Sequence, residues 1–300
     1  MATKRGVYFL ANDKTYELAV TFLNSLRKYE KEVSLCLIPF DENWTRIASL
    51  ADTYNFDVYN DYVALKKCDH WSERFHAQTK GQYRKLAAWN GDFDEFIYID
   101  IDTVIMQSIN PVFDLIKDFS VVTGHSHIEG SRKFVWKDSI RSTELRPDEI
   151  NYAANTGFML SRRGVLNFAR IEELLPEAIA FSPHMELSCA EQPFLNFLII
   201  RSGEPYTSLY KIASDSANPE MLIECWAGDL AWHLVVDGVC KYNTEPKNVL
   251  FVHWAGEWAP TEKHPVIANS CIRQRMKNAH IWNHYRALVP ARQIAKDPLQ

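Results

Sequence analysis

Two aspartates at the end of an apolar segment are the residues best suited to do chemistry. Segment 96–106 reads F-I-Y-I-D-I-D-T-V-I-M, and this apolar, β-branched and aromatic run predicts a strand buried on both faces of an α/β sheet. In an extended chain, Asp100 and Asp102 project from the same face and can converge on one cation. Two buried like charges need a divalent metal or a cationic ligand to neutralise them. Alternatively, the strand ends at Ile99 and both acids are solvated loop residues.

The composition sets the class of protein. Three hundred residues with 47% apolar content can bury one large core, and we expect an α/β domain over 1–260 followed by a C-terminal helical extension over 261–300. A net charge of −5 without a block of Lys and Arg argues against nucleic acid as the main partner. Six cysteines without a C-x-x-C pair predict reduced thiols. No apolar run approaches the ~20 residues of a transmembrane segment, so we expect a soluble, cytoplasmic protein.

Strand and helix signals alternate in the first part of the chain. Strands are expected at 6–11, 33–38 and 56–59, with apolar residues at helical spacing between them. This alternation implies a parallel sheet, in which ligands bind beyond the carboxyl ends of the strands. Residues 11–13 and 100–102 both lie at such ends. There is no G-x-G-x-x-G after the first strand and no G-x-x-x-x-G-K-[ST] anywhere, so neither dinucleotide redox chemistry nor a P-loop is supported.

Other polar residues lie on elements predicted later in the chain. Helices are expected over 78–89, 165–181, 189–201 and 266–288, and strands over 119–123, 155–160 and 249–252. Arg84 or Lys85 could reach phosphates, or both are solvated helix charges. Glu191 could serve only the dipole of its helix, and a lone His253 at a strand end is most often structural. The polar segment 125–151 is too long for an ordinary connection, so it is either a mobile lid or an acceptor-binding insertion.

Five short motifs in a fixed order carry a resemblance to a known family. They are K-L-x-x-W at 85–89, I-D-I-D-T at 99–103, N-T-G at 155–157, E-Q at 191–192 and H-x-x-G at 253–256. With these in order, the chain resembles a GT-A fold glycosyltransferase, closest to glycosyltransferase family eight, the group of glycogenin, galactinol synthase and bacterial lipopolysaccharide glycosyltransferases. The resemblance covers roughly 6–256. It implies a Rossmann-like, mostly parallel central sheet flanked by helices.

The resemblance also implies a role for particular residues. Those expected to bind the donor are Leu10, Ala11, Asn12, Asp13, Tyr16, Lys85, Asp100, Ile101, Asp102 and Gly256. Asp100, Asp102 and His253 resemble the ligands of a manganese ion, and their oxygen and nitrogen atoms are also compatible with magnesium. Asn155 and Gln192 would orient sugar hydroxyls. Glu191 would be the acid nearest the sugar, where the family usually has Asp.

The implied reaction is metal-dependent transfer of a hexose from a nucleotide diphosphate sugar, with UDP as the expected nucleotide, to a hydroxyl acceptor with retention of configuration. The chain departs from the family at Ala259, where Lys is common, and Lys263 is the candidate replacement. Two alternatives stay open. A sugar nucleotidyltransferase would usually carry a Gly-rich basic loop after the first strand, which this chain lacks. A catalytically silent nucleotide-sugar-binding protein would keep the fold and bind without turnover.

Overall fold

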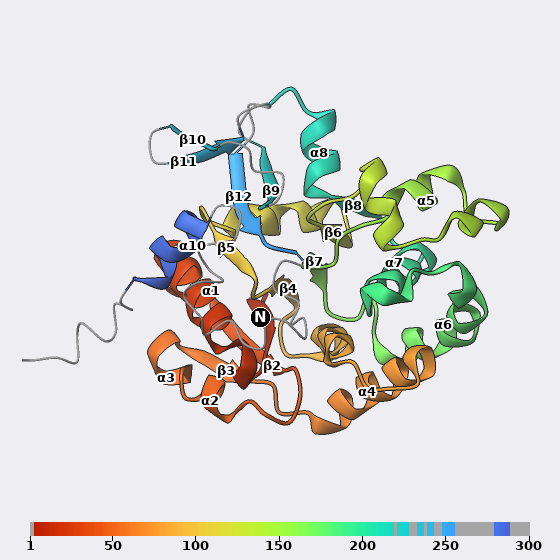
Figure 1. Cartoon of the computed structure of the whole chain (residues 1–300), viewed down its shortest axis with the longest axis horizontal. Helices are drawn as coiled ribbons and strands as arrows, with labels where there is room; N and C mark the ends of the chain where they lie inside the picture. The colour runs from red at the N-terminus through yellow and green to blue at the C-terminus, as the bar shows by residue number, and fades with distance from the viewer. Residues whose placement is uncertain are drawn as a thin grey trace, which may run out of the picture.

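A seven-stranded sheet forms the centre of the protein (Figure 1). The computed structural model describes residues 3–218, 221–227, 233–236, 239–242, 248–255 and 279–288. In spatial order the strands are β3 (Phe56–Val58), β2 (Ser34–Pro39), β1 (Arg5–Ala11), β4 (Glu95–Asp100), β7 (Phe158–Arg162), β6 (Val121–Thr123) and β8 (Tyr206–Ser208). Only β7 runs antiparallel to its neighbours, β4 and β6. The mostly parallel α/β sheet predicted from the sequence is therefore confirmed.

A second, smaller sheet stands beside the end of β4. It contains β5 (Thr103–Ile105), β9 (Leu222–Trp226), β10 (His233–Val236), β11 (Val239–Tyr242) and β12 (Asn248–His253). Strand β12 pairs antiparallel with β5 and parallel with β9. The sequence predicted β12 but not the sheet around it. Because β5 follows β4 after a two-residue bend, this sheet brings distant parts of the chain to the edge of the central one.

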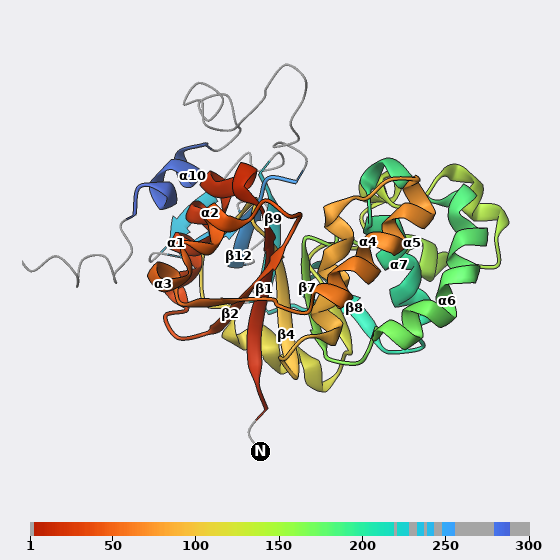
Figure 2. The ribbon, with the colours of Figure 1, turned by 90° about the horizontal axis from the view of Figure 1, so that it is seen from below.

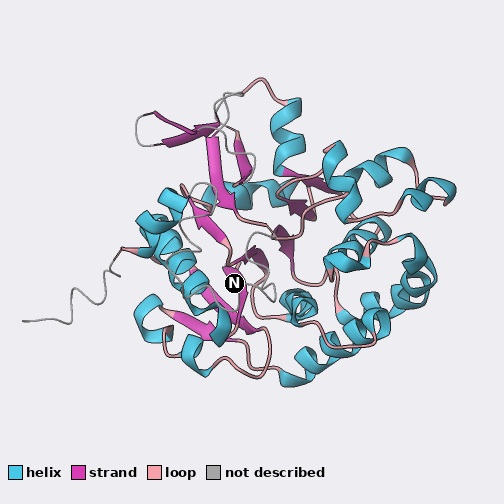
Figure 3. Cartoon of the chain, in the orientation of Figure 1, coloured by secondary structure: helices cyan, strands magenta, loops and turns pink. Residues whose placement is uncertain are grey.

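Helices cover both faces of the central sheet (Figures 2 and 3). On one side lie α1 (Tyr16–Tyr29), α2 (Thr45–Ala48), α3 (Ala51–Tyr54) and α10 (Ala279–Arg286), and on the other α4 (Tyr62–His76), α5 (Pro147–Tyr152), α6 (Phe168–Phe181) and α7 (Gln192–Arg201). The remaining elements are α8 (Leu209–Asp215) and the 3-10 helices η1 (Asp13–Thr15), η2 (Gly81–Asn90), η3 (Asn110–Lys117), η4 (Glu129–Phe134), η5 (Asp138–Ser142), η6 (Ser182–His184) and η7 (Leu187–Cys189). Among the described residues, no helix combines the length and the apolar character needed to cross a lipid bilayer.

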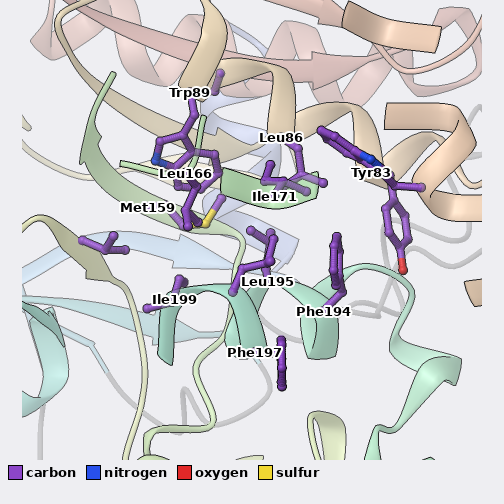
Figure 4. Packing of buried hydrophobic residues seen from close by; sticks show 14 of the residues in the cluster. Tyr83, Leu86, Trp89, Met159, Leu166, Ile171, Phe194, Leu195, Phe197 and Ile199 are labelled. Carbon is purple, nitrogen blue, oxygen red and sulfur yellow. The ribbon is translucent and has the colours of Figure 1, made fainter. Parts of the chain in front are cut away.

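Alternate side chains of the central strands enter two different cores. Phe9 of β1 and Ile99 of β4 pack with α1, whereas Tyr8 and Tyr98 pack on the opposite face. This alternation follows from the two-residue period of a strand. Figure 4 shows part of the second core, in which Tyr83, Leu86 and Trp89 of η2 lie near Phe194 and Leu195 of α7. The packing therefore holds η2 against the beginning of α7.

The segment 125–151 is folded into short helices and packs on the second core. It contains η4, η5 and α5, and its residues Val135, Trp136, Ile140 and Leu145 are buried in the second core. Trp136 is only 2% exposed, and its ring meets Phe181 of α6 edge-on. Although the segment is mostly polar, these apolar residues all pack in the second core. Both interpretations of the segment, as a mobile lid and as an acceptor-binding insertion, stay predictions.

The last described helix, α10, is docked on α1. The Asn24 side chain donates to the backbone oxygens of Tyr285 and Leu288 at 2.9 and 3.0 Å, and Arg286 pairs with Glu17 at 2.6 Å. Helix α10 lies within the helical segment expected at 266–288, although 256–278 and 289–300 are outside the described residues. The domain boundary at 260 therefore stays a prediction.

Candidate functional site

Asp100, Asp102 and His253 meet at the carboxyl end of β4. One ligand atom from each of the three lies within 4.8 Å of the other two. Strand β4 ends at Asp100 and β5 begins at Thr103, so Asp102 lies in the bend between two strands. The expectation that one continuous strand carries both acids on the same face is therefore wrong. The bend nevertheless brings the carboxylates together, and at 32% and 20% side-chain exposure they are neither buried nor freely solvated.

Strand pairing explains how these residues come together. In the parallel register of β1 and β4, Leu10 lies beside Asp100, and in the antiparallel register of β12 and β5, His253 lies opposite Thr103. The Trp254 amide donates to the Asp102 backbone oxygen at 2.9 Å. His253, which was predicted from a motif far along the chain, is therefore brought to the two aspartates by the pairing of β12 with β5, the strand that follows β4 in the chain.

The His253 ring lies between two carboxylates. Its Nε2 is 3.2 Å from Asp102 Oδ1 and its Nδ1 is 2.6 Å from Glu224 Oε1, with only 3% of the side chain exposed. Burial alone would lower the pKa of His253, but the two acids raise it well above its usual value. Burial opposes ionisation of Asp102, yet the imidazolium holds the pKa of Asp102 below its usual range. In the metal-free protein His253 is therefore protonated and joins both acids.

Lys85 forms a second buried charge cluster beside Asp100. Its Nζ is 2.6 Å from Glu191 Oε1 and 3.4 Å from Asp100 Oδ1, and Lys85 is 2% exposed against 6% for Glu191. Burial lowers the pKa of Lys85, but Asp100 and Glu191 outweigh it and raise that pKa. The Tyr98 hydroxyl also donates to Asp100 Oδ1, at 2.5 Å. Oδ1 of Asp100 is thus held by the protein, whereas Oδ2 lies on the side of Gly157 that also faces His253.

The neighbouring Arg84 belongs to the structure and not to the site. Its guanidinium makes two hydrogen bonds to Asp69, at 2.7 and 2.8 Å, and one to Glu42 at 2.8 Å. It is 3% exposed. Of the two basic residues that could have reached phosphates, only Lys85 lies at the candidate site, and the idea that both are solvated helix charges is wrong.

The N-T-G turn closes the site from one side. Asn155 Oδ1 accepts from the Gly157 amide at 2.8 Å, and the Gly157 oxygen accepts from the Asp100 amide at 2.7 Å. A Cβ on Gly157 would lie 2.5 Å from His253 Cε1 and 3.0 Å from Asp100 Oδ2. Glycine is required here because the backbone passes so close to the metal-ligand candidates.

Glu191 and Gln192 lie at the start of α7, directed at the same turn. Glu191 Oε1 accepts from the Thr156 hydroxyl at 3.1 Å. Gln192 Oε1 accepts from the Thr156 amide at 3.3 Å, and its Nε2 donates to the Phe134 oxygen at 3.1 Å. Glu191 is therefore next to Lys85, both side chains contact Thr156 of the turn, and both are fixed by protein contacts.

The segment expected to hold the nucleotide follows β1. Asn12 Nδ2 donates to Asp41 Oδ2 at 2.7 Å, Asp13 Oδ1 accepts from the Ile47 amide at 3.0 Å, and the Arg46 guanidinium lies 3.8 Å from the centre of the Tyr16 ring. Leu10 and Ala11 are buried in the strand. The polar side chains of Asn12 and Asp13 thus anchor the loop over 41–47 beside the carboxyl end of β1.

Two predicted donor residues need separate comment. Ile101 is 6% exposed and packs in the first core, so only its backbone is available to a ligand. Gly256, together with Ala259 and Lys263, lies outside the described residues.

Glu224 is the site residue that the sequence did not reveal. It is on β9, which was not predicted, and its Oε1 accepts from His253 Nδ1 at 2.6 Å and from Trp226 Nε1 at 3.0 Å. Burial alone would raise the pKa of Glu224, but the His125 and His253 imidazoles hold it below its usual range. The only available signal was one acid inside the apolar segment L-I-E-C-W at 222–226.

The three converging ligands fit a divalent cation. Two carboxylates and one imidazole form a mixed oxygen and nitrogen donor set, which suits manganese and is compatible with magnesium. It is the one such cluster of His, Cys, Asp and Glu found within the part of the chain that the structure describes.

Comparison with known proteins identifies the fold. No family model and no curated protein sequence matches the chain. Among solved structures it resembles WbbM, a bifunctional glycosyltransferase (TM-score 0.58, 12% identity, covering 99% of this chain and 52% of that one). It also resembles the galactosyltransferase LgtC in complex with donor and acceptor sugar analogues (0.53, 13%, 97% and 100%) and the glycosyltransferase GlyE of Streptococcus pneumoniae TIGR4 (0.53, 13%, 98% and 63%).

These likenesses cover nearly the whole of this chain but about half of the WbbM chain. At 12–13% identity they establish the fold and not the activity. The chain has the GT-A fold of the glycosyltransferases, as the motif order predicted.

Proposed function

We propose that the protein is a metal-dependent glycosyltransferase that moves a hexose from a UDP-sugar to a hydroxyl acceptor with retention of configuration. The observation that carries the proposal is the meeting of Asp100, Asp102 and His253 at the carboxyl end of β4, within a GT-A fold. Ligands bind at this edge of such sheets. Lys85, held by Glu191 and Asp100, provides a positively charged amine where a diphosphate would lie.

Asp100, Asp102 and His253 would hold Mn²⁺, or Mg²⁺ in its place. When bound, the cation neutralises charge on the departing nucleoside diphosphate as a Lewis acid. The loop that follows β1 would hold the nucleotide, with Asn12 and Asp13 fixing the loop and the Tyr16 ring forming part of its surface.

The remaining residues would position the sugar and stabilise charge. Lys85 stays protonated beside Asp100 and attracts the diphosphate. The side-chain oxygen of Asn155 accepts a hydrogen bond from the Gly157 amide, so its NH₂ group would donate to a sugar hydroxyl. Gln192 would orient a second hydroxyl from the start of α7.

The position of Glu191 supports a front-side reaction. This acid is bonded to Lys85 and Thr156, so it is poorly placed to attack the anomeric carbon. In the proposed step the acceptor oxygen bonds to the anomeric carbon, the bond from that carbon to the diphosphate oxygen breaks on the same face, and the acceptor proton passes to the departing diphosphate. Such a reaction depends on positioning and electrostatics.

The location that we propose is cytoplasmic. Cys36, Cys68 and Cys189 are free thiols, and free thiols are typical of reducing compartments. The partners would be a nucleotide sugar and a hydroxyl acceptor, and the net charge of −5 gives no support for nucleic acid.

A thermal-shift panel with nucleotides and metals tests the proposal. UDP with Mn²⁺ should raise the melting temperature while Mn²⁺ alone does little, because phosphate oxygens complete the coordination shell. A hundredfold excess over the dissociation constant adds about 2.7 kcal/mol, which is easily measured. Release of UDP from a nucleotide sugar should follow, and Asp102→Asn should abolish it.

The same panel separates the alternatives. Stabilisation by UDP and Mn²⁺ without turnover of any nucleotide sugar favours a silent binding protein. Release of pyrophosphate from UTP and a sugar 1-phosphate favours a nucleotidyltransferase. No shift with any nucleoside diphosphate contradicts the proposed function.

A further inference from the structure

Glu224 is a buried acid at the back of the candidate site. Its side chain is 0% exposed, and burying a carboxylate is costly unless it is paired. In the parallel register of β9 and β12, Glu224 lies beside Phe251, two residues before His253. Because alternate residues of a strand share a face, this register places Glu224 and His253 on the same side of the small sheet.

The two nitrogens of His253 face different acids. Nδ1 is 2.6 Å from Glu224 Oε1, away from the aspartates, and Nε2 is 3.2 Å from Asp102 Oδ1. An ionised carboxylate only accepts hydrogen bonds, so in the neutral ring Glu224 keeps the proton on Nδ1 and leaves Nε2 as the lone-pair nitrogen. We propose that Glu224 is a positioning residue that fixes the ring and tautomer of His253, so that Nε2 faces a divalent cation bound with a nucleoside diphosphate.

The surroundings of Glu224 hold its carboxylate in one orientation. Trp226 Nε1 donates to the same oxygen, Oε1, at 3.0 Å. The other oxygen, Oε2, is buried and receives no hydrogen bond from the described residues. It lies over Gly124, where a Cβ would be 1.9 Å away, so glycine leaves room for the carboxylate. The inference rests on the proposed function, since it requires that the three ligands hold a cation.

Titration calorimetry of Mn²⁺ with UDP tests the inference at a pH high enough that the dissociation constant of the wild type no longer changes with pH, so that the His253 ring is neutral in both proteins before the metal binds. Glu224→Gln keeps the shape of the side chain but removes its charge and its preference for a proton on Nδ1. The dissociation constant should rise by about 10–100-fold, the usual effect of losing such a partner. The matched control is Glu30→Gln, because Glu30 is also a buried acid, 4% exposed, and accepts from Ser108 and Asn110 far from the site. That variant should lower the melting temperature and leave the dissociation constant unchanged.

The outcomes distinguish the two proposals. If the wild-type protein does not bind Mn²⁺ with UDP, the proposed function fails and the role of Glu224 fails with it. If the wild type binds and Glu224→Gln binds equally well, only the role of Glu224 is overturned.

A measurement on the wild type covers the case in which Glu224→Gln does not fold. In protein labelled with ¹⁵N-histidine and loaded with ¹¹³Cd²⁺ and UDP, the nuclear magnetic resonance spectrum should show cadmium coupled to Nε2 of His253 and a proton retained on Nδ1. Cadmium coupled to Nδ1, or a proton on Nε2, overturns the inference.

Discussion

Raising the pH should strengthen the binding of Mn²⁺ with UDP well above neutrality. A metal binds the neutral imidazole, so the Nε2 proton of His253 must leave first. From the sequence alone, the affinity was expected to change near pH ~6.5, the pKa of a free histidine. In the structure, Asp102 and Glu224 raise the pKa of His253 well above that value. The pH range over which the affinity changes is therefore higher as well.

The size of the effect follows from one proton. Below the raised pKa, each metal bound displaces one proton, so affinity changes tenfold for each pH unit, or about 1.4 kcal/mol. From pH 7.0 to 8.0 the dissociation constant should therefore fall by about tenfold. Phosphate groups lose their last proton near pH ~6, so the UDP ligand contributes little to the slope.

Calorimetry in buffers of different ionisation enthalpy measures both quantities. We expect about one proton released for each Mn²⁺ bound at pH 7 to 7.5. His253→Ala should bind more weakly and lose the pH dependence. A dissociation constant that stays flat from pH 7 to 8 in the wild type, with no proton released, refutes the view that a protonated His253 is a metal ligand.

The metal-free protein should show the opposite trend. A group whose pKa is higher in the folded than in the unfolded chain stabilises the fold fully below the unfolded value, and the contribution is lost as the pH rises through the folded value. Raising the pH above ~6.5 should therefore lower the free energy of unfolding of the metal-free wild type by up to about 1.4 kcal/mol per pH unit until the folded pKa is passed, and the melting temperature should fall with it. His253→Ala should lack this decline.

Three further substitutions test other parts of the site. Gly157→Ala should abolish binding of Mn²⁺ with UDP in calorimetry while circular dichroism keeps the fold, because the added Cβ would lie 2.5 Å from His253 Cε1; unchanged affinity contradicts this. Asp102→Asn should abolish turnover and lower metal-free stability by about 1.5–3 kcal/mol in urea unfolding, since a charged hydrogen bond is lost; relief of repulsion between the aspartates would instead raise stability. Trp136→Ala should lower the free energy of unfolding by about 3–5 kcal/mol in the same assay, because a buried ring is removed. A change near zero would favour the mobile-lid interpretation.

The sequence predicted those features that short segments determine. The buried strand before Asp100, the parallel sheet and the positions of most helices follow from local apolar patterns. The site residues could be named in advance because the motif order resembled a family. The sequence could not show why Gly157 is glycine, since that depends on where His253 Cε1 lies in the folded chain.

The rest depended on contacts between distant segments. Glu224 reaches the site only through the pairing of β9 with β12, and no local pattern predicts which strands pair. The Lys85 and Glu191 pair depends on the packing of η2 against α7. The packing of 125–151 depends on the contact between the Trp136 and Phe181 rings. In each case the position of a residue is set by contacts with a segment that is distant in the sequence.

Charge balance links these contacts to the proposed chemistry. Four acids, Asp100, Asp102, Glu191 and Glu224, surround two cations, Lys85 and protonated His253. Replacing the His253 proton with a divalent cation adds one positive charge to this cluster, and a bound diphosphate then brings negative charge to Lys85 and the metal. Within the described residues, every one of these acids is held by a cation, so none is poised as a nucleophile. Under the proposed function, the site would hold these charges in place while the sugar passes from the diphosphate to the acceptor hydroxyl.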